Sequence, residues 1–500
     1  MHLTLRKGLM KGKTSVLIVF SFLLLSFTEK EPVNDPRPNI LLITSDDHGP
    51  HLSCYGNKFI QTPHLDAIAN NGILFRNAYI TAAVCSPSRS SILTGLYPHQ
   101  TGHLGLTTHG FRFVGEVTTI YQQMKAAGYR TGMLGKLHVE PESFFPIDYW
   151  PLKSPNYEKK DMARYARYAG QFMNQSDEPF FLMVNFPDPH WPFVDVVEGR
   201  PRNPVKPEDV TSFSYIGMDN ERIRKYSTAI YNGILRLDEC IGELMAQLKE
   251  SGKLENTLVI FLSDHGDEMA KGKFDIYEAA TKVPFLVSWP KALPKGVQSN
   301  ALISSIDIVP TILDAAGISS VPKGVTGKSL LPVCKKPNKK FRDYLFTEKN
   351  CTQVDMYYPR RAVRDKRYKL IYSLLDKKEN MVAMRYMSAG PNSPIAGSAN
   401  HKELKNAPDS IKKMYQEWLY PNKVQLYDLE KDPNEFHDLS DDPKYAKIKK
   451  RLMKKLLQWQ QDTDDPFRFP EKLNKLTQEM DTMKISKNMQ WQYPHYLYGK

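Results

Sequence analysis

The chain has 500 residues, more than a single hydrophobic core usually supports, so a large domain and a smaller one are expected. Its composition, with 41% hydrophobic and 25% charged residues and no low-complexity tract, excludes a fibrous or disordered protein. The formal net charge of +13 suits a polyanionic partner, although a lysine-rich solvated surface would have the same charge.

The first 28 residues have the layout of a secretory signal peptide. Four basic residues precede an apolar run of thirteen residues at 15–27, which is short for a membrane span. We therefore expect an exported protein, periplasmic or secreted, with no stable membrane span; an uncleaved anchor is the weaker alternative. Export disfavours a nucleic-acid partner, and no motif for one is present.

The next 300 residues alternate between buried-strand patterns and helical patterns. Residues 39–45 (NILLITS) form a continuous apolar run, typical of a strand buried on both faces. This alternation predicts an α/β fold with a mostly parallel sheet flanked by helices, within a catalytic domain at 36–335. The other expected strands are 131–134, 180–186 and 257–262, and the expected helices are 119–127, 220–249 and 306–316.

A polar cluster follows each of these four strands. In open α/β sheets ligands bind at the carboxyl ends of the strands, so clusters that are far apart in sequence should converge on one face. The four pairs are Asp46 and Asp47, Lys136 and His138, Asp188 and His190, and Asp264 and His265.

A lysine-rich connector at 335–340 separates a smaller C-terminal subdomain, 341–500, from the catalytic domain. The subdomain is expected to be α+β, built on a short antiparallel sheet. Cys334 and Cys351 flank the connector, and a disulfide between them is possible. Its expected elements are strands at 343–348, 368–372 and 424–427, and an amphipathic helix at 442–461.

The aspartates are candidate metal ligands. Adjacent carboxylates at a strand end repel each other unless a cation neutralises them, and oxygen donors favour a hard ion such as Ca²⁺ or Mg²⁺. A solvated Asp-Asp turn is the alternative for either pair alone. The predicted ligands of one ion are Asp46, Asp47, Asp264 and His265; the family resemblance of the next motif adds Cys85 to them.

Residues 85–95 (CSPSRSSILTG) carry the most specific motif. A lone Cys85 would most often be a buried structural thiol. The pattern C-x-P-S-R-x-x-x-L-T-G, however, resembles the signature of type I sulfatases of the alkaline phosphatase superfamily. The resemblance implies an alkaline-phosphatase-like fold and conversion of Cys85 to formylglycine (3-oxoalanine). A formylglycine-generating or sulfatase-maturing enzyme would then be a required partner.

A second stretch, residues 128–138 (GYRTGMLGKLH), resembles the family pattern G-Y-x-T-x-x-x-G-K-x-H. By this resemblance Lys136 holds a sulfate oxygen or the nucleophile, and His138 accepts a proton from the formylglycine hydroxyl. Arg89 steadies the hydrated aldehyde, whose hydroxyl attacks sulfur. His190 would be the general acid, and Lys273 would clamp sulfate, with Lys271 as the competing assignment.

Other segments, such as YYPRRAVRDKRYKLIY, resemble the heparan N-sulfatases (sulfamidases). The substrate implied is a sulfated oligo- or polysaccharide attacked from a chain end, with Asp188, Arg360 and Arg361 as candidate sugar contacts. Two departures leave the cleaved linkage open. The family's Asp-Asn metal pair is Asp264-His265 here, and Lys273 stands where sulfamidases use arginine.

Three alternatives remain open. An O-sulfatase acting on an algal polysaccharide, for example the rhamnose sulfate of ulvan, is the main rival. A phosphatase or phosphodiesterase of the same superfamily would use two metals and a Ser or Thr nucleophile. A glycan-binding relative without activity would not need a nucleophile at Cys85.

Overall fold

The central strand of the protein, β1 (Asn39–Asp46), lies between two parallel neighbours in an eight-stranded sheet. The computed structural model describes residues 37–154, 157, 159–390, 393–486 and 494–498; the expected signal peptide lies outside them. The strand order is β4-β3-β5-β1-β6-β7-β2-β8. The remaining strands are β2 (Ile73–Tyr79), β3 (Arg130–Gly135), β4 (Tyr149–Leu152), β5 (Phe180–Pro189), β6 (Thr257–Ser263), β7 (Phe285–Ser288) and β8 (Val297–Ser304).

This sheet confirms the predicted mostly parallel α/β architecture. All four expected strands are present, and only β7 runs antiparallel to its two neighbours. The apolar residues of β1 alternate between the two faces of the sheet, because successive side chains of a strand point in opposite directions. Ile40 and Leu42 belong to one hydrophobic core, and Leu41 and Ile43 belong to the other.

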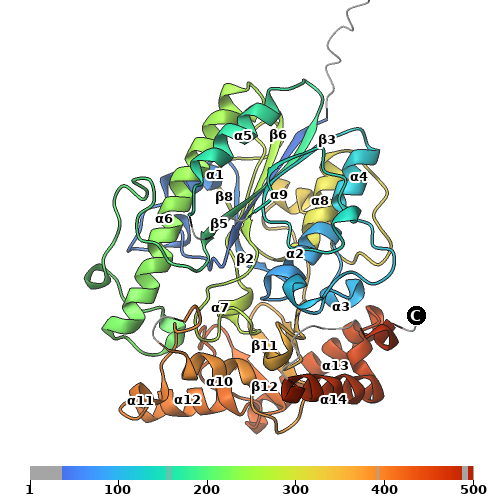
Figure 1. Ribbon diagram of the computed structural model, residues 1–500. Helices are drawn as coiled ribbons and strands as arrows, with labels where there is room; N and C mark the ends of the chain where they lie inside the picture. Colours follow the sequence, from blue (N-terminus) through green and yellow to red (C-terminus); the bar gives the residue numbers. More distant parts are fainter. Residues whose placement is uncertain (1–36, 155–156, 158, 391–392, 487–493, 499–500) are drawn as a thin grey trace, which may run out of the picture. The chain divides into compact units, whose positions relative to one another are not determined.

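Helices cover both faces (Figure 1). One face is covered by α1 (Pro63–Asn70), α5 (Ala163–Met173) and the long α6 (Glu221–Glu250). The other is covered by α2 (Cys85–Thr94), α4 (Ile120–Ala126) and α8 (Ile308–Ala315). The expected helices at 119–127 and 220–249 are confirmed as α4 and α6. The expected helix at 306–316 begins with a 3-10 turn, Ser305–Asp307, and continues as α8. Shorter helices are α3 (Pro98–Thr101), α7 (Glu278–Thr281) and α9 (Leu331–Lys335).

The C-terminal region forms a second, antiparallel sheet in the order β12-β11-β10-β9. Its helix α13 packs Leu452, Leu456 and Trp459 into a core beneath this sheet, as the predicted helical spacing requires. The strands are β9 (Leu345–Lys349), β10 (Arg360–Arg364), β11 (Tyr368–Ser373) and β12 (Val424–Asp428). The helices are α10 (Met381–Ser388), α11 (His401–Leu404), α12 (Asp409–Leu419), α13 (Ala446–Asp462) and α14 (Pro470–Ser486).

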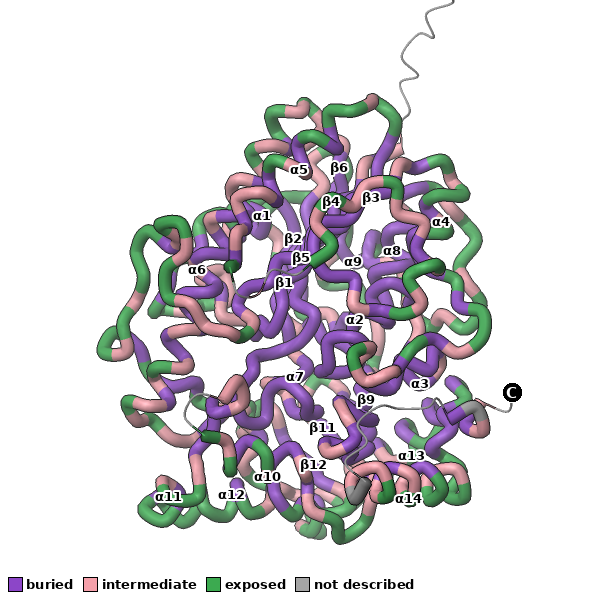
Figure 2. The backbone as a smooth tube through the Cα atoms, in the orientation of Figure 1, coloured by how far each residue is buried: buried purple, intermediate pink, exposed green. Residues whose placement is uncertain are grey.

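The buried backbone follows the central strands and the loops at their carboxyl ends (Figure 2). Every cysteine is a free thiol, so the disulfide considered between Cys334 and Cys351 is not formed. Among the described residues, none of the helices combines the length and apolar character that crossing a bilayer requires.

Candidate active site

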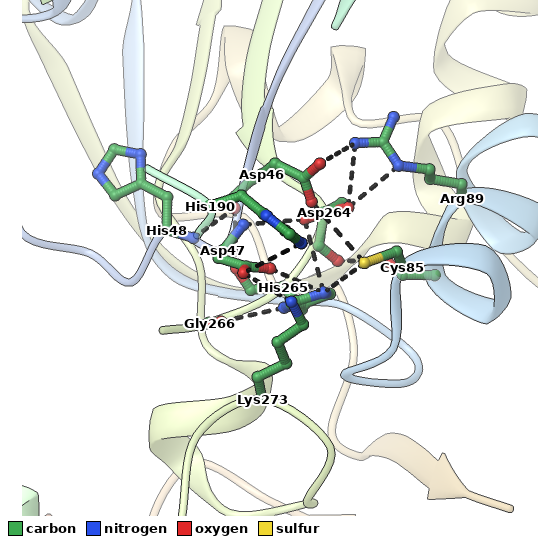
Figure 3. Close-up of polar contacts among 12 residues, drawn as sticks. Asp46, Asp47, His48, Cys85, Arg89, His190, Asp264, His265, Gly266 and Lys273 are labelled. Carbon is green, nitrogen blue, oxygen red and sulfur yellow. Dashed lines mark hydrogen bonds and ion pairs between the residues drawn. The ribbon is translucent and has the colours of Figure 1, made fainter. Parts of the chain in front are cut away.

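The carboxyl ends of four neighbouring strands, in the order β3-β5-β1-β6, bring the predicted clusters together. Register pairs Ser45 of β1 with Ser263 of β6, so Asp46 and Asp264 emerge side by side. On the other side, β5 pairs with both β1 and β3, which places Lys136 beside the same edge. With the exception of Asp188, the residues of the four clusters therefore converge as expected, and Figure 3 shows the carboxylates around one point.

Cys85 is the first residue of α2 and is 3% exposed. Its Sγ lies 3.3 Å from Nε2 of His265 and 3.8 Å from Oδ1 of Asp46 (Figure 3). The free N–H groups at the start of a helix favour an anion, so a negatively charged group at this position is stabilised by α2.

Four donor groups can surround a single ion. The ligand atoms of Asp46, Asp47, Cys85 and His265 all lie within 4.8 Å of one another. Asp47 has a φ of 65°, a left-handed conformation that few residues other than glycine, asparagine and aspartate adopt readily. Its Oδ1 is buried and accepts no hydrogen bond from the described residues. Two carboxylates and an imidazole that converge in this way, with Oδ1 of Asp47 only 3.2 Å from Nε2 of His265, fit a divalent cation.

Asp264 lies at the edge of this donor set. Its Oδ2 accepts a hydrogen bond from Nε of Arg89 at 3.0 Å and forms an ion pair with Nη2 of the same guanidinium at 3.0 Å. Its Oδ1 accepts a hydrogen bond from the backbone nitrogen of Asp47 at 3.2 Å. Oδ1 is also 3.8 Å from Nε2 of His265. Asp264 thus joins Arg89 to the cluster, and Oδ1 remains the atom available to an ion.

The charges in the cluster are strongly coupled. Burial opposes ionisation of Asp46, but Lys136 and Arg89 outweigh it and hold the pKa of Asp46 well below its usual range. Burial and the charge of Asp46 raise the pKa of Asp264. Burial would lower the pKa of His265, yet Asp264 and Asp47 raise it to about 10. The carboxylates therefore stabilise positive charge beside them, that of Lys136, Arg89 and the imidazolium form of His265.

Two lysines reach the cluster from opposite sides. Lys136 Nζ lies 3.0 Å from Oδ2 of Asp46, and Lys273 Nζ lies 2.7 Å from Oδ2 of Asp47. Lys271, the competing assignment, points elsewhere, since its Nζ donates to the backbone carbonyls of Asn434 and Glu435. The geometry favours Lys273 over Lys271 as the residue that contacts an anion in the site.

Both predicted histidines border the same cavity. His138 has a φ of 56°, and burial together with Lys136 lowers its pKa well below the usual value. His190 Nε2 lies 3.8 Å from Oδ2 of Asp47, and burial with the charge of Lys273 lowers the pKa of His190 to about 3. Burial and the neighbouring lysines thus favour the neutral form of both imidazoles.

The cavity has a volume of about 570 Å³ and opens beside Cys85. Its lining brings together the nucleophile candidate, the cations and both histidines. Trp150 and Trp191 provide apolar surface, which suits the nonpolar face of a small ring. Six of its lining residues belong to the site described here: Cys85, Lys136, His138, His190, Glu268 and Lys273.

Two residues in the site were not expected from the sequence. The Tyr157 hydroxyl donates to Oδ2 of Asp46 at 2.5 Å, and its ring stacks on His190 with centroids 4.1 Å apart. Glu268 Oε1 lies 3.3 Å from Lys273 Nζ. Tyr157 lies in a loop without a motif; Glu268 follows Asp264-His265 by only a few residues, a closeness that could have drawn attention to it.

The three predicted sugar contacts lie elsewhere. Asp188 is fully buried between Arg236, at 2.6 and 2.8 Å, and Lys160, at 2.8 Å. Arg360 pairs with Asp275, and Arg361 pairs with Asp465. None of the three lines the cavity, and none has exposed surface. The structure corrects this expectation: these charges stabilise buried contacts of the fold.

The chain matches two protein-family models and a human enzyme. The sulfatase family model matches residues 38–318, and the model for the C-terminal region of N-sulphoglucosamine sulphohydrolase matches residues 270–392. Human N-sulphoglucosamine sulphohydrolase is 33% identical over 467 residues, which cover 86% of this chain and 91% of the human protein.

The chain is also similar to a bacterial sulfatase and to a solved structure. An ulvan-active sulfatase of Formosa agariphila is 31% identical over 464 residues, covering 88% of this chain and 83% of that protein. A solved complex of another protein with its substrate D-glucosamine-2-N,6-O-disulfate has a TM-score of 0.62 and 24% identity, covering 86% of this chain and 98% of that one. The structural likeness shows a shared fold.

Proposed function

Because this chain belongs to the sulfatase family, and is a sulfuric ester hydrolase by that membership, we propose that it removes sulfate groups from a sulfated glycan as an exo-acting, heparan N-sulfatase-like enzyme. The observation that carries the proposal is the position of Cys85. Its sulfur lies at the start of α2, within 3.3 Å of His265 and 3.8 Å of Asp46, in a cavity lined by Lys136 and Lys273.

Position 85 supplies the nucleophile. Conversion of Cys85 to formylglycine by a maturing enzyme would place an aldehyde hydrate, with two hydroxyls, at this point. Arg89 supports it indirectly, because its guanidinium contacts Asp264 and Asp46 at 3.0 and 3.6 Å and fixes both carboxylates. Attack at sulfur adds negative charge to the sulfate oxygens, and Lys136 and Lys273 are the cations that stabilise it.

Asp46, Asp47, Asp264 and His265 would hold one divalent ion, Ca²⁺ or Mg²⁺, with position 85 beside it. When bound, the ion neutralises the carboxylates and favours the ionised form of an oxygen nucleophile. The residues themselves hold the geometry: the backbone nitrogen of Asp47 donates to Asp264, and Tyr157 fixes Asp46.

Two imidazoles handle the protons. The S–N or S–O bond breaks, and the leaving amine or hydroxyl takes a proton from His190. With the charges of the site alone, Lys273 and burial depress the pKa of His190. An anionic sulfate beside Lys273 offsets that repulsion, so substrate binding favours protonation of His190. His138, kept neutral, accepts the proton of the second hydroxyl as sulfate is released.

Similarity to two relatives supports the choice of substrate. The match to the N-sulphoglucosamine sulphohydrolase C-terminal model covers residues 270–392, which include the loop bearing Lys273, and supports an N-sulfated glucosamine end group. The similarity to the ulvan-active sulfatase supports the second candidate, an O-sulfatase acting on rhamnose sulfate of ulvan. We also propose export of the protein through the N-terminal signal at residues 1–28.

Incubation with defined sugars tests the proposal. The wild-type protein, produced together with a formylglycine-generating enzyme, is given N-sulfoglucosamine, glucosamine 6-O-sulfate or rhamnose 3-sulfate, and sulfate release is measured. Fastest release from N-sulfoglucosamine supports the first candidate, and fastest release from rhamnose sulfate supports the second. Absence of release from every sulfated sugar, with Cys85 fully converted, would overturn both.

A further inference from the structure

Glu268 is a carboxylate in the cavity that the proposed reaction does not use. It is 4% exposed and lines the cavity together with Cys85 and His190. Its Oε1 lies 3.3 Å from Lys273 Nζ, whereas its Oε2 is buried and accepts no hydrogen bond from the described residues. Burial and the charge of Asp47 outweigh Lys273 and raise the pKa of Glu268 to about 7, so the ionised carboxylate lacks stabilisation at Oε2. Such an atom in a cavity points to a hydrogen-bond donor on the ligand.

The loop that carries Glu268 is held in place. The backbone nitrogen of Lys273 donates to the carbonyl of Asp267 at 2.7 Å, and that of Gly272 donates to Met269 at 2.8 Å. The Tyr386 hydroxyl donates to the carbonyl of Lys273 at 3.2 Å. Glu268 and Lys273 are therefore fixed side by side, as a specific contact requires.

A second metal ion does not explain this arrangement. Ligand atoms of Asp47, His190 and Glu268 lie within 4.8 Å of one another and could in principle hold an ion. Lys273 Nζ, however, is 2.7 Å from Asp47 and 3.3 Å from Glu268, and already provides a positive charge to both carboxylates. An additional cation there would have to share Asp47 with the first ion and would also lie against this ammonium group.

We propose that Glu268 is a specificity-determining residue that accepts a hydrogen bond from a free hydroxyl on the carbon next to the sulfated one. The inference rests on the proposed function, in which Lys273 contacts the sulfate group. Because Glu268 and Lys273 are adjacent, a sugar whose sulfate is held by Lys273 presents its neighbouring substituent to Oε2. The enzyme therefore selects sugars with a hydroxyl there and discriminates against a second, neighbouring sulfate, which offers Oε2 no donor.

This contact is tested by removing the hydroxyl from the sugar, the carboxylate of Glu268 from the enzyme, and then both together. N-sulfoglucosamine is used as its methyl glycoside, so that carbon 1 carries no free hydroxyl, and the hydroxyl removed is the one at carbon 3. For rhamnose 3-sulfate, the hydroxyls at carbons 2 and 4 are removed in turn. Wild type is expected to lose about 10- to 100-fold in kcat/KM when this hydroxyl is replaced by hydrogen. Glu268→Ala should show no further loss with the deoxy sugar, because the contact is already absent.

Two more variants separate recognition from damage to the loop. Glu268→Gln keeps the shape of the side chain but offers a neutral acceptor, and should retain only part of the preference for the hydroxyl. Glu140→Gln changes an exposed carboxylate of the same cavity and should keep the full wild-type preference. A sugar that carries a second sulfate in place of the neighbouring hydroxyl gives a further comparison. The ratio of its hydrolysis rate to that of the monosulfated sugar should be higher for Glu268→Ala than for wild type, a gain that a damaged site would not produce.

These measurements distinguish failure of the Glu268 contact from failure of the proposed sulfatase activity. Suppose that wild type releases sulfate, and that replacing the hydroxyl by hydrogen lowers kcat/KM equally in wild type and in Glu268→Ala. This result would overturn the role of Glu268 and leave the sulfatase proposal standing. The role of Glu268 would also be overturned if replacing the hydroxyl did not lower kcat/KM of wild type. Loss of sulfate release from every sugar by the wild-type enzyme would remove the proposed function and this inference with it.

Discussion

The sulfur of Cys85 lies 3.3 Å from Nε2 of His265, although 180 residues separate them in the sequence. Cys85 begins α2, and His265 follows β6 at the carboxyl edge of the sheet. Their contact brings the position of the nucleophile to the predicted metal ligands. The chemistry therefore depends on the register between β1 and β6 and on the docking of α2 against their ends.

Removal of divalent ions should stop the reaction. A chelator is expected to abolish sulfate release, and added Ca²⁺ or Mg²⁺ should restore it. A free ion concentration of about 100 times the Kd should raise the free energy of unfolding of wild type by about 2.7 kcal/mol, which is seen as a higher Tm. Asp47→Asn should shift this stabilisation to higher metal concentration, since it removes a carboxylate ligand. Unchanged ion binding to Asp47→Asn, measured by equilibrium dialysis, would contradict the assigned ligand set.

Loss of the ammonium group at position 273 should impair sulfate binding and turnover. Lys273→Ala is expected to lower kcat/KM by about 10²- to 10³-fold, the effect of removing one group that stabilises transition-state charge. Lys273→Arg should retain most of the activity. Lys271→Ala is the matched control: it should lower the Tm, because Lys271 binds two backbone carbonyls, while kcat/KM of the folded protein changes little. The reverse pattern would reassign the clamp to Lys271.

Tyr157 should contribute through its hydrogen bond to Asp46. Tyr157→Phe keeps the ring on His190 and removes only the hydroxyl, so kcat/KM should fall about tenfold. Tyr165→Phe is the control, because the buried Tyr165 hydroxyl makes no hydrogen bond with the described residues. Equal kinetics of Tyr157→Phe and wild type would show that the Asp46 contact does not matter for the reaction.

The ion pair of Arg361 and Asp465 should stabilise the C-terminal region in a pH-dependent way. Burial disfavours ionisation of Asp465, but Arg361 and His99 outweigh it and hold the pKa of Asp465 below its usual range. The stabilisation is therefore complete above the unfolded-state pKa of about 3.9 and is lost as the pH falls below it. Asp465→Asn should cost about 3 kcal/mol at pH 7, since it leaves Arg361 without its main partner.

Chemical denaturation at pH 7 and at pH 3.5 measures both effects. The difference between wild type and Asp465→Asn should shrink at the lower pH. The neighbouring Asp464 provides the control: its side chain is 90% exposed, and Asp464→Asn should change the free energy of unfolding by less than about 0.5 kcal/mol. A difference between wild type and Asp465→Asn that does not depend on pH would contradict this account.

Strands, helices and the convergence of polar clusters could be predicted because each depends on local patterns. The apolar run of β1 and the motif around Cys85 are contiguous in the sequence. Tyr157 could not be predicted, because its contact with Asp46 spans 111 residues and no periodic pattern surrounds it. Arg360 and Arg361 were misjudged for the same reason: their partners, Asp275 and Asp465, are 85 and 104 residues away, so charged residues in β10 could be buried.

Conversion of Cys85 is the most direct test of the central claim. Wild type and Cys85→Ala are each produced with a formylglycine-generating enzyme, the peptide containing residue 85 is analysed by mass spectrometry, and sulfate release is measured. The account predicts the mass change of thiol to aldehyde and sulfate release in wild type only, with circular dichroism and Tm showing that both variants are folded. Sulfate release by pure, folded Cys85→Ala at the wild-type rate would contradict it.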